Sequence, residues 1–154
     1  MIIHVECKPD EALVGKLGFT KKQVEHHFGK SRVFAAIKDL TDQVALVDED
    51  PMSATTTYED QLISQRVVYG VTIKLDPARN NRVLFLQVKL EDWIIGACKA
   101  NKLDLTHFNL PDRPNELHEV INNRLQAFQR LLDELLRLKN PHLSTLSEWL
   151  HKRN

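Results

Sequence analysis

The stretch VALVDEDP, residues 44–51, decides the fold class of this chain. Four consecutive apolar residues run directly into an acidic triplet and a proline, which is typical of a buried strand that ends in a polar loop. IIHVECKP, residues 2–9, has the same form, because a short apolar run ends there at Glu6. Residues 23–28 lie between the two and predict another strand. Strands that alternate with helical segments favour right-handed crossovers and a parallel sheet.

Two amphipathic segments separate these strands. Residues 9–17 carry apolar side chains three to four positions apart, after a proline start and before Gly18, which predicts a helix. Ser31 is the expected N-cap of a second helix, whose apolar face consists of Val33, Phe34, Ile37 and Leu40. The first fifty residues therefore predict an α/β architecture.

The rest of the chain predicts a hairpin followed by helices. A loop with a short helical turn at 58–63 precedes two strands, at 67–75 and 83–88, which flank the turn residues 76–81. Helices are expected at 90–102, 115–139 and 143–149, the second as one long amphipathic helix. We therefore predict a mostly parallel, Rossmann-like sheet flanked by helices over residues 1–110, with C-terminal helices at 111–154 packed on the same core.

Composition indicates a globular protein with one core. The 154 residues include 42% hydrophobic and 27% charged residues, and Lys plus Arg equals Asp plus Glu at 21 each. The zero net charge provides no general attraction for nucleic acid or anionic membranes, so any nucleic-acid binding is expected to be local. No apolar run approaches the length of a membrane span, and the acidic start is unlike a signal peptide. Cys7 and Cys98 form no zinc or disulfide pattern, which favours a reducing cytoplasm.

Acidic residues stand where two of the predicted strands end. Glu6 ends the first strand, and Asp48 and Asp50 follow the third. In parallel α/β sheets, ligands collect at the carboxyl ends of the strands. Asp48 and Asp50 are two residues apart and would point the same way from an extended segment. Converging carboxylates suit Mg²⁺, although an Asp-x-Asp after a strand is also a common solvated turn.

These residues resemble two motifs of the Toprim family, which is shared by bacterial primases, topoisomerases, recombination-repair proteins and the overcoming-lysogenization-defect nucleases. Glu6 ends a hydrophobic strand and Asp10 lies four positions later, which is similar to the family's first motif. Residues 45–50 are similar to the second motif, a strand that ends in Asp-x-Asp. The resemblance covers about the first two thirds of the chain. Cys7 and Pro51 depart from it, because relatives have glycine there, and they alter the expected approach of a phosphate.

The resemblance implies a magnesium- or manganese-dependent site that acts on phosphodiester bonds of DNA or RNA. Glu6 would serve as a metal ligand or general acid/base, and Asp48 and Asp50 would hold the metal. Lys30 in a Gly-Lys-Ser turn and Glu91 at a helix start resemble supporting residues of the nuclease branch, and Asp10 joins the metal set. Two structural alternatives stay open. Lys30 could lie in a plain strand-to-helix turn, and Glu91 could be a favourable charge at the start of a helix.

Three other groups of residues have simple structural explanations. His4, His26 and His27 are expected to alternate between an inward, hydrogen-bonded position and the surface. Cys7, beside the proposed site, is expected to be a buried neutral thiol. The basic residues between the two motifs form either a phosphate-binding surface or a solvated face, and they are Lys21, Lys22, Lys30, Arg32 and Lys38.

Three classes of function follow from these residues. The leading expectation is a magnesium-dependent, nuclease-like protein. The alternative is a non-catalytic Toprim-like binding or regulatory module that works with a protein partner, which the small size and neutral charge favour. A phosphoryl-transfer enzyme for small phosphates is the third class. The apolar stripe of the long helix offers a homodimer seam, although packing within its own chain explains the stripe better.

Overall fold

The computed structural model describes residues 1–152 and is built on one six-stranded sheet. The strand order is β2-β1-β3-β6-β5-β4, with parallel pairing from β2 to β6 and antiparallel pairing from β6 to β4. The predicted α/β class with a mostly parallel sheet is therefore confirmed. The strands are β1 (Ile3–Val5), β2 (Val24–His26), β3 (Val44–Asp48), β4 (Ile63–Val68), β5 (Val71–Asp76) and β6 (Asn81–Leu86).

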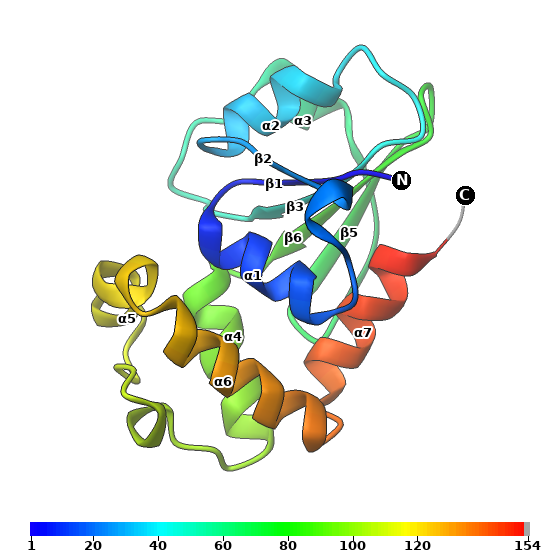
Figure 1. Cartoon of the computed structure of the whole chain (residues 1–154). Coiled ribbons are helices and arrows are strands. Elements are labelled where there is room, and N and C mark those ends of the chain that lie inside the picture. The colour runs from blue at the N-terminus through cyan, green and yellow to red at the C-terminus, as the bar shows by residue number, and fades with distance from the viewer. Residues whose placement is uncertain (153–154) are drawn as a thin grey trace.

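Helices cover both faces of this sheet. Figure 1 shows α2 and α3 on one face and α1, α4, α6 and α7 on the other. The helices are α1 (Lys8–Lys16), α2 (Lys30–Ile37), α3 (Thr57–Gln61), α4 (Leu90–Ala100), α5 (Pro114–Val120), α6 (Leu125–Arg137) and α7 (Pro141–His151), with 3₁₀ turns η1 (Lys21–Gln23), η2 (Leu105–Phe108) and η3 (Ile121–Asn123). Within residues 1–152, no helix combines the length and apolar character needed to cross a membrane.

Strand β3 supplies side chains to both faces of the sheet. Val44 and Leu46 belong to the larger core, whereas Ala45 and Val47 belong to the smaller core beneath α2 and α3. Successive strand residues point to opposite faces, so a continuous apolar run is required where both faces are covered. This burial explains why residues 44–47 contain no polar residue.

The apolar stripe of the C-terminal helices is buried inside the chain. Phe128 and Leu132 of α6 and Leu146 of α7 are fully buried and share one core with Ile3 of β1. Helix α6 packs against α1 and α7. The stripe is therefore covered by the protein's own helices and is not exposed as a dimer seam.

Two elements that were predicted to be continuous are each divided in two in the structure. The single helix expected at 115–139 is interrupted between α5 and α6, where Arg124 leaves helical geometry at φ −130° and ψ 39°. Asn122 and Asn123 precede the break, and asparagine competes with the helix through its own backbone hydrogen bonds. The strand expected at 67–75 is two strands, because Tyr69 and Gly70 both have positive φ, 48° and 70°. Two such residues form the tight hairpin turn that right-handed strand twist favours.

The start of α2 also differs from the prediction. Gly29, at φ 112°, is the residue before the helix, so Ser31 lies inside the first turn and does not cap it. The left-handed backbone there favours glycine, which carries no Cβ to clash. Lys30 consequently begins the helix rather than lying in an open turn. The short helical turn predicted near 58–63 and the hairpin around 76–81 are confirmed by α3 and by the β5–β6 pairing.

We expect Leu132→Ala to lower the free energy of unfolding by about 2–5 kcal/mol, because truncating a fully buried leucine leaves a cavity in the shared core. Urea unfolding followed by circular dichroism and tryptophan fluorescence measures this loss. The matched control is Leu40→Ala, whose side chain is 47% exposed, and which should cost less than about 1 kcal/mol. Equal losses in the two variants would contradict the assignment of α6 to the core.

Candidate acidic site

The candidate site lies where the chain changes direction across the sheet. From β1 the chain crosses by α1 to β2 on one side, and then returns by α2 to β3 on the other side of β1. Helices α1 and α2 lie on opposite faces, so the carboxyl ends of β1 and β3 flank a topological switch point (Figure 1). Such points open a crevice for ligands. Glu6 and Asp48 stand at these two strand ends.

A direct hydrogen bond joins the two strand ends. The Asp48 backbone N–H donates to Glu6 Oε2 at 2.5 Å, and the Leu90 backbone N–H donates to Asp48 Oδ1 at 2.9 Å. Leu90 begins α4, so the Asp48 carboxylate also accepts from the positive end of a helix. Strand β1, strand β3 and helix α4 are thereby connected through two acidic side chains.

Two further carboxyl groups are buried next to these. Asp10 of α1 is 1% exposed, and neither of its carboxylate oxygens has a hydrogen-bond partner within residues 1–152. Glu91 of α4 is 5% exposed; its Oε1 lies 2.9 Å from His118 Nδ1, and its Oε2 has no partner among the described residues. A buried carboxylate without a partner is unfavourable, so these oxygens are available for a proton or a cation.

Burial and nearby negative charges raise the pKa values of Asp48, Asp10 and Glu6. Burial, followed by the charges of Asp10 and Glu6, raises the pKa of Asp48 to about 9. Burial and the neighbouring charge of Glu6 raise the pKa of Asp10 to about 7. The pKa of Glu6 is also raised, mainly by burial, while the hydrogen bond from Asp48 and the charge of Lys30 oppose the rise. The folded protein therefore favours proton uptake or cation binding at these carboxyl groups.

Asp50 and Lys30 belong to a smaller, adjoining hollow. Asp50 has φ 38°, so the segment after Asp48 is not extended, contrary to the prediction. Lys30 Nζ donates to the Glu49 backbone oxygen at 2.8 Å and to Glu59 Oε1 at 3.3 Å. Glu59 was not identified from the sequence, because nothing in the segment around α3 distinguishes it from a solvated helix residue. Lys30 thus takes an inward position supported by an acidic partner.

Two hollows of about 560 Å³ and 310 Å³ meet at the ends of β1 and β3. Glu6, Gly29 and Asp48 line both. The larger hollow is also lined by Glu91 and by His118, which the sequence does not single out because it lies on a separate helix. The structure therefore groups Glu6 and Asp48 with Asp10 and Glu91 on one side and with Asp50 and Lys30 on the other.

The other sequence candidates are not part of this acidic grouping, although Cys7 and His26 line the larger hollow. Burial raises the pKa of the Cys7 thiol, which keeps it neutral as expected. Lys30 is 10% exposed, whereas the remaining basic residues between the motifs are exposed at the surface; these are Lys21, Lys22, Arg32 and Lys38. None of these four residues lines either hollow, and Lys21 lines a separate groove beside α1.

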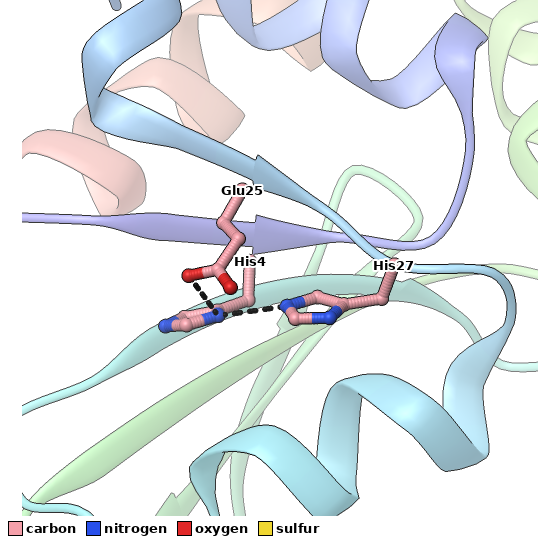
Figure 2. A group of neighbouring side chains, drawn as sticks. All are labelled: His4, Glu25 and His27. Carbon is pink, nitrogen blue, oxygen red and sulfur yellow. Dashed lines mark hydrogen bonds and ion pairs between the residues drawn. The ribbon is translucent and has the colours of Figure 1, made fainter.

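The acidic oxygens are not grouped as closely as the direct ligands of one ion. Within residues 1–152, one group of three His, Cys, Asp or Glu side chains has its ligand atoms within 4.8 Å of one another, and it is His4, Glu25 and His27 (Figure 2). Glu6, Asp48 and Asp10 are spread more widely than that. Mg²⁺ binds carboxylates while keeping several waters, so the orphaned oxygens of Asp10 and Glu91 and the oxygen-only donor set fit it.

We expect the acidic cluster to make stability fall with rising pH. The unfolded chain releases the Asp48 and Asp10 protons near pH 4, whereas folding raises the two pKa values to about 9 and about 7. Their stabilising contribution is therefore complete below about pH 4 and is lost as the pH rises through 7 and 9. Asp48→Asn, measured by urea unfolding in chelator, should be more stable than wild type at pH 8 by about 1–3 kcal/mol.

The matched control for this measurement is Asp39→Asn, since the Asp39 side chain is 78% exposed. Its stability should follow that of wild type across the pH range. If Asp48→Asn were no more stable than wild type at pH 8, the Asp48 carboxyl would not be strained by its neighbours.

The geometry of these carboxyl groups is the basis for assigning a function. Their oxygens, the adjoining lysine and the two hollows together form a candidate site. No protein-family model, curated protein or solved structure matches this chain.

Proposed function

We propose that this protein is a Toprim-like, magnesium- or manganese-dependent phosphodiester hydrolase that acts on DNA or RNA. One observation carries the proposal: buried carboxyl groups converge at the switch point between β1 and β3, and two of them keep oxygens without partners. A fold gains no stability from such groups, because their charges raise the pKa values of Asp48 and Asp10. Strongly perturbed pKa values in a cleft are typical of functional sites.

The donor set favours a hard divalent cation. Glu6 and Asp48 would hold it at the strand ends, with Asp10 and Glu91 behind them. When bound, Mg²⁺ supplies positive charge and Lewis acidity toward a phosphoryl oxygen. The four carboxyl groups would then be compensated, which removes the repulsion between them.

The protein's own groups provide for binding and proton transfer. The raised pKa of Glu6 brings it closer to neutral pH, where a general acid/base is most effective. Lys30 faces the smaller hollow together with Asp50, and it supplies a cation within reach of a phosphate there. Lys8, His26 and His118 line the larger hollow. Lys8 and Lys30 provide the local attraction for nucleic acid that the neutral chain as a whole does not have.

We expect purified protein to cleave plasmid DNA or a short RNA only when Mg²⁺ or Mn²⁺ is present. Glu6→Gln and Asp48→Asn should each reduce the rate at least about a hundredfold, because each removes a ligand or a proton-transfer group. Cleavage is measured on gels as a function of metal concentration. Asp39→Asn, at an exposed carboxylate outside the hollows, should retain the wild-type rate.

The outcomes distinguish the chemical classes. Metal-independent cleavage, or equal cleavage by Asp48→Asn and wild type, would refute the proposal. Hydrolysis of a generic phosphate ester without cleavage of DNA or RNA would favour a phosphoryl-transfer enzyme for small phosphates instead.

A second candidate function is a non-catalytic module that works with a protein partner. The exposed outer strand β4 favours it, because β4 lies at the edge of the sheet and presents Ile63 and Val67, which are 52% and 57% exposed. Such an edge accepts another strand through main-chain hydrogen bonds. A second copy of this chain, paired β4 to β4, is the simplest partner.

For this alternative, light scattering should give twice the chain mass, and Val67→Lys should return the protein to a monomer, because a lysine on an edge strand opposes further pairing. Leu40→Lys is the control, since it adds the same charge at another exposed apolar position. A monomer at every concentration would argue against β4 as a homodimer interface.

A further inference from the structure

A second group of ligand-bearing side chains arises from the pairing of β1 with β2. His4 lies directly opposite Glu25 in this parallel register, so the two side chains leave the same face of the sheet. His27 follows Glu25 by two residues and therefore returns to that face, and its N–H continues the ladder by donating to the Val5 oxygen at 2.8 Å. Figure 2 shows the three side chains converging between the strands and α2.

The orientation of His4 is set by a residue outside the group. His4 Nε2 lies 2.8 Å from Gln43 Oε1, and the Gln43 amide nitrogen donates to the Thr41 oxygen at 2.8 Å. Because Gln43 Oε1 can only accept, His4 carries its proton on Nε2 and keeps a lone pair on Nδ1. Metal-binding histidines typically donate their other ring N–H to an oxygen in this way.

The Nδ1 atom of His4 faces the other two ligands, and without metal it accepts a hydrogen bond from His27 Nε2. His4 Nδ1 lies 3.0 Å from His27 Nε2 and 3.8 Å from Glu25 Oε2. Two ligands of one tetrahedral zinc ion, with Zn–N bonds of about 2.0–2.1 Å, lie about 3.3 Å apart. The observed separations bracket this value, and all three ligand atoms lie within 4.8 Å of one another.

We propose that His4, Glu25 and His27 form a binding site for a divalent transition metal ion, with Zn²⁺ as the favoured ion and water as the fourth ligand. Two imidazoles and one carboxylate are a zinc-type donor set with an open position, whereas Mg²⁺ prefers oxygen ligands alone. The site is chemically distinct from the oxygen-only acidic site, and it does not depend on the function proposed there.

An exposed Glu25 and a buried His4 allow a metal to bind without a change in the fold. Glu25 is 58% exposed, so its carboxylate can move toward an ion, whereas His4 is 3% exposed and provides the fixed point. Burial lowers the pKa of His27, and the charge of Glu25 opposes this shift. A neutral His27 can carry its proton on Nδ1 and present the Nε2 lone pair to the metal.

A bound ion would link the edge strand β2 to β1. Strand β2 has three residues and forms that edge of the sheet, so few main-chain hydrogen bonds hold it. Glu25 from β2, His27 just after β2 and His4 from β1 would meet at one ion. The folded chain should therefore gain stability from zinc, because a site assembled by this register is absent in the unfolded chain.

The test is a titration of Zn²⁺ into the full chain by calorimetry, repeated with His27→Ala and Glu25→Gln. We expect one zinc per wild-type chain, at least tenfold weaker binding in both variants, and a rise in Tm of roughly 5–10 °C for wild type at a hundredfold excess over Kd. His107→Ala is the matched control, because His107 is 78% exposed and lies outside the group. It should bind zinc as wild type does.

Circular dichroism without metal verifies that the variants are folded, and the half-buried or exposed positions of the two substituted residues favour this. The absence of zinc binding by wild type would overturn the proposal. Zinc binding that is lost in Asp48→Asn but kept in His27→Ala and Glu25→Gln would assign the ion to the acidic site and would equally overturn it. A large excess of Mg²⁺ should not displace the zinc.

Discussion

The parallel pairing of β1 with β3 is the constraint on which the acidic site depends. Because β2 and β3 lie on opposite sides of β1, the helices that lead to them cover opposite faces and leave the strand ends open between them. The Asp48 N–H then donates to Glu6 across this opening. A one-residue shift in the β1–β3 register would separate these two groups and turn the side chains of the shifted strand to the wrong face.

This geometry brings carboxyl groups close together in the acidic site, where their negative charges repel one another. Carboxyl groups from two strands and two helices approach one another in a poorly solvated place. The pKa values of Asp48, Asp10 and Glu6 rise as a result, so the folded state prefers these groups protonated or bound to a cation. The surrounding hydrophobic cores supply the stability that tolerates this arrangement. Strain of this kind is typical of functional sites, which carry chemistry at the expense of stability.

One sheet thus presents two sets of ligands with different chemistry. The ends of β1 and β3 collect carboxylate oxygens suited to Mg²⁺, whereas the register of β1 and β2 collects two imidazoles and a carboxylate suited to Zn²⁺. His4 and Glu6 belong to the same short segment, so β1 contributes to both. Strand β1, an inner strand of the parallel part of the sheet, therefore contributes to both candidate sites.

Local sequence patterns were sufficient to predict the α/β class, most strands and helices, and the places of Glu6 and Asp48 at strand ends. Apolar periodicity and strand ends are properties of neighbouring residues, so they can be recognised in the sequence. They were insufficient for the hairpin at Gly70 and the break at Arg124, where backbone geometry overrides a continuous apolar pattern. The roles of His118 and Glu59 and the meeting of His4 with His27 were decided only by the tertiary structure. Such contacts join residues far apart in the chain, and they depend on strand register and helix packing, which no local pattern specifies.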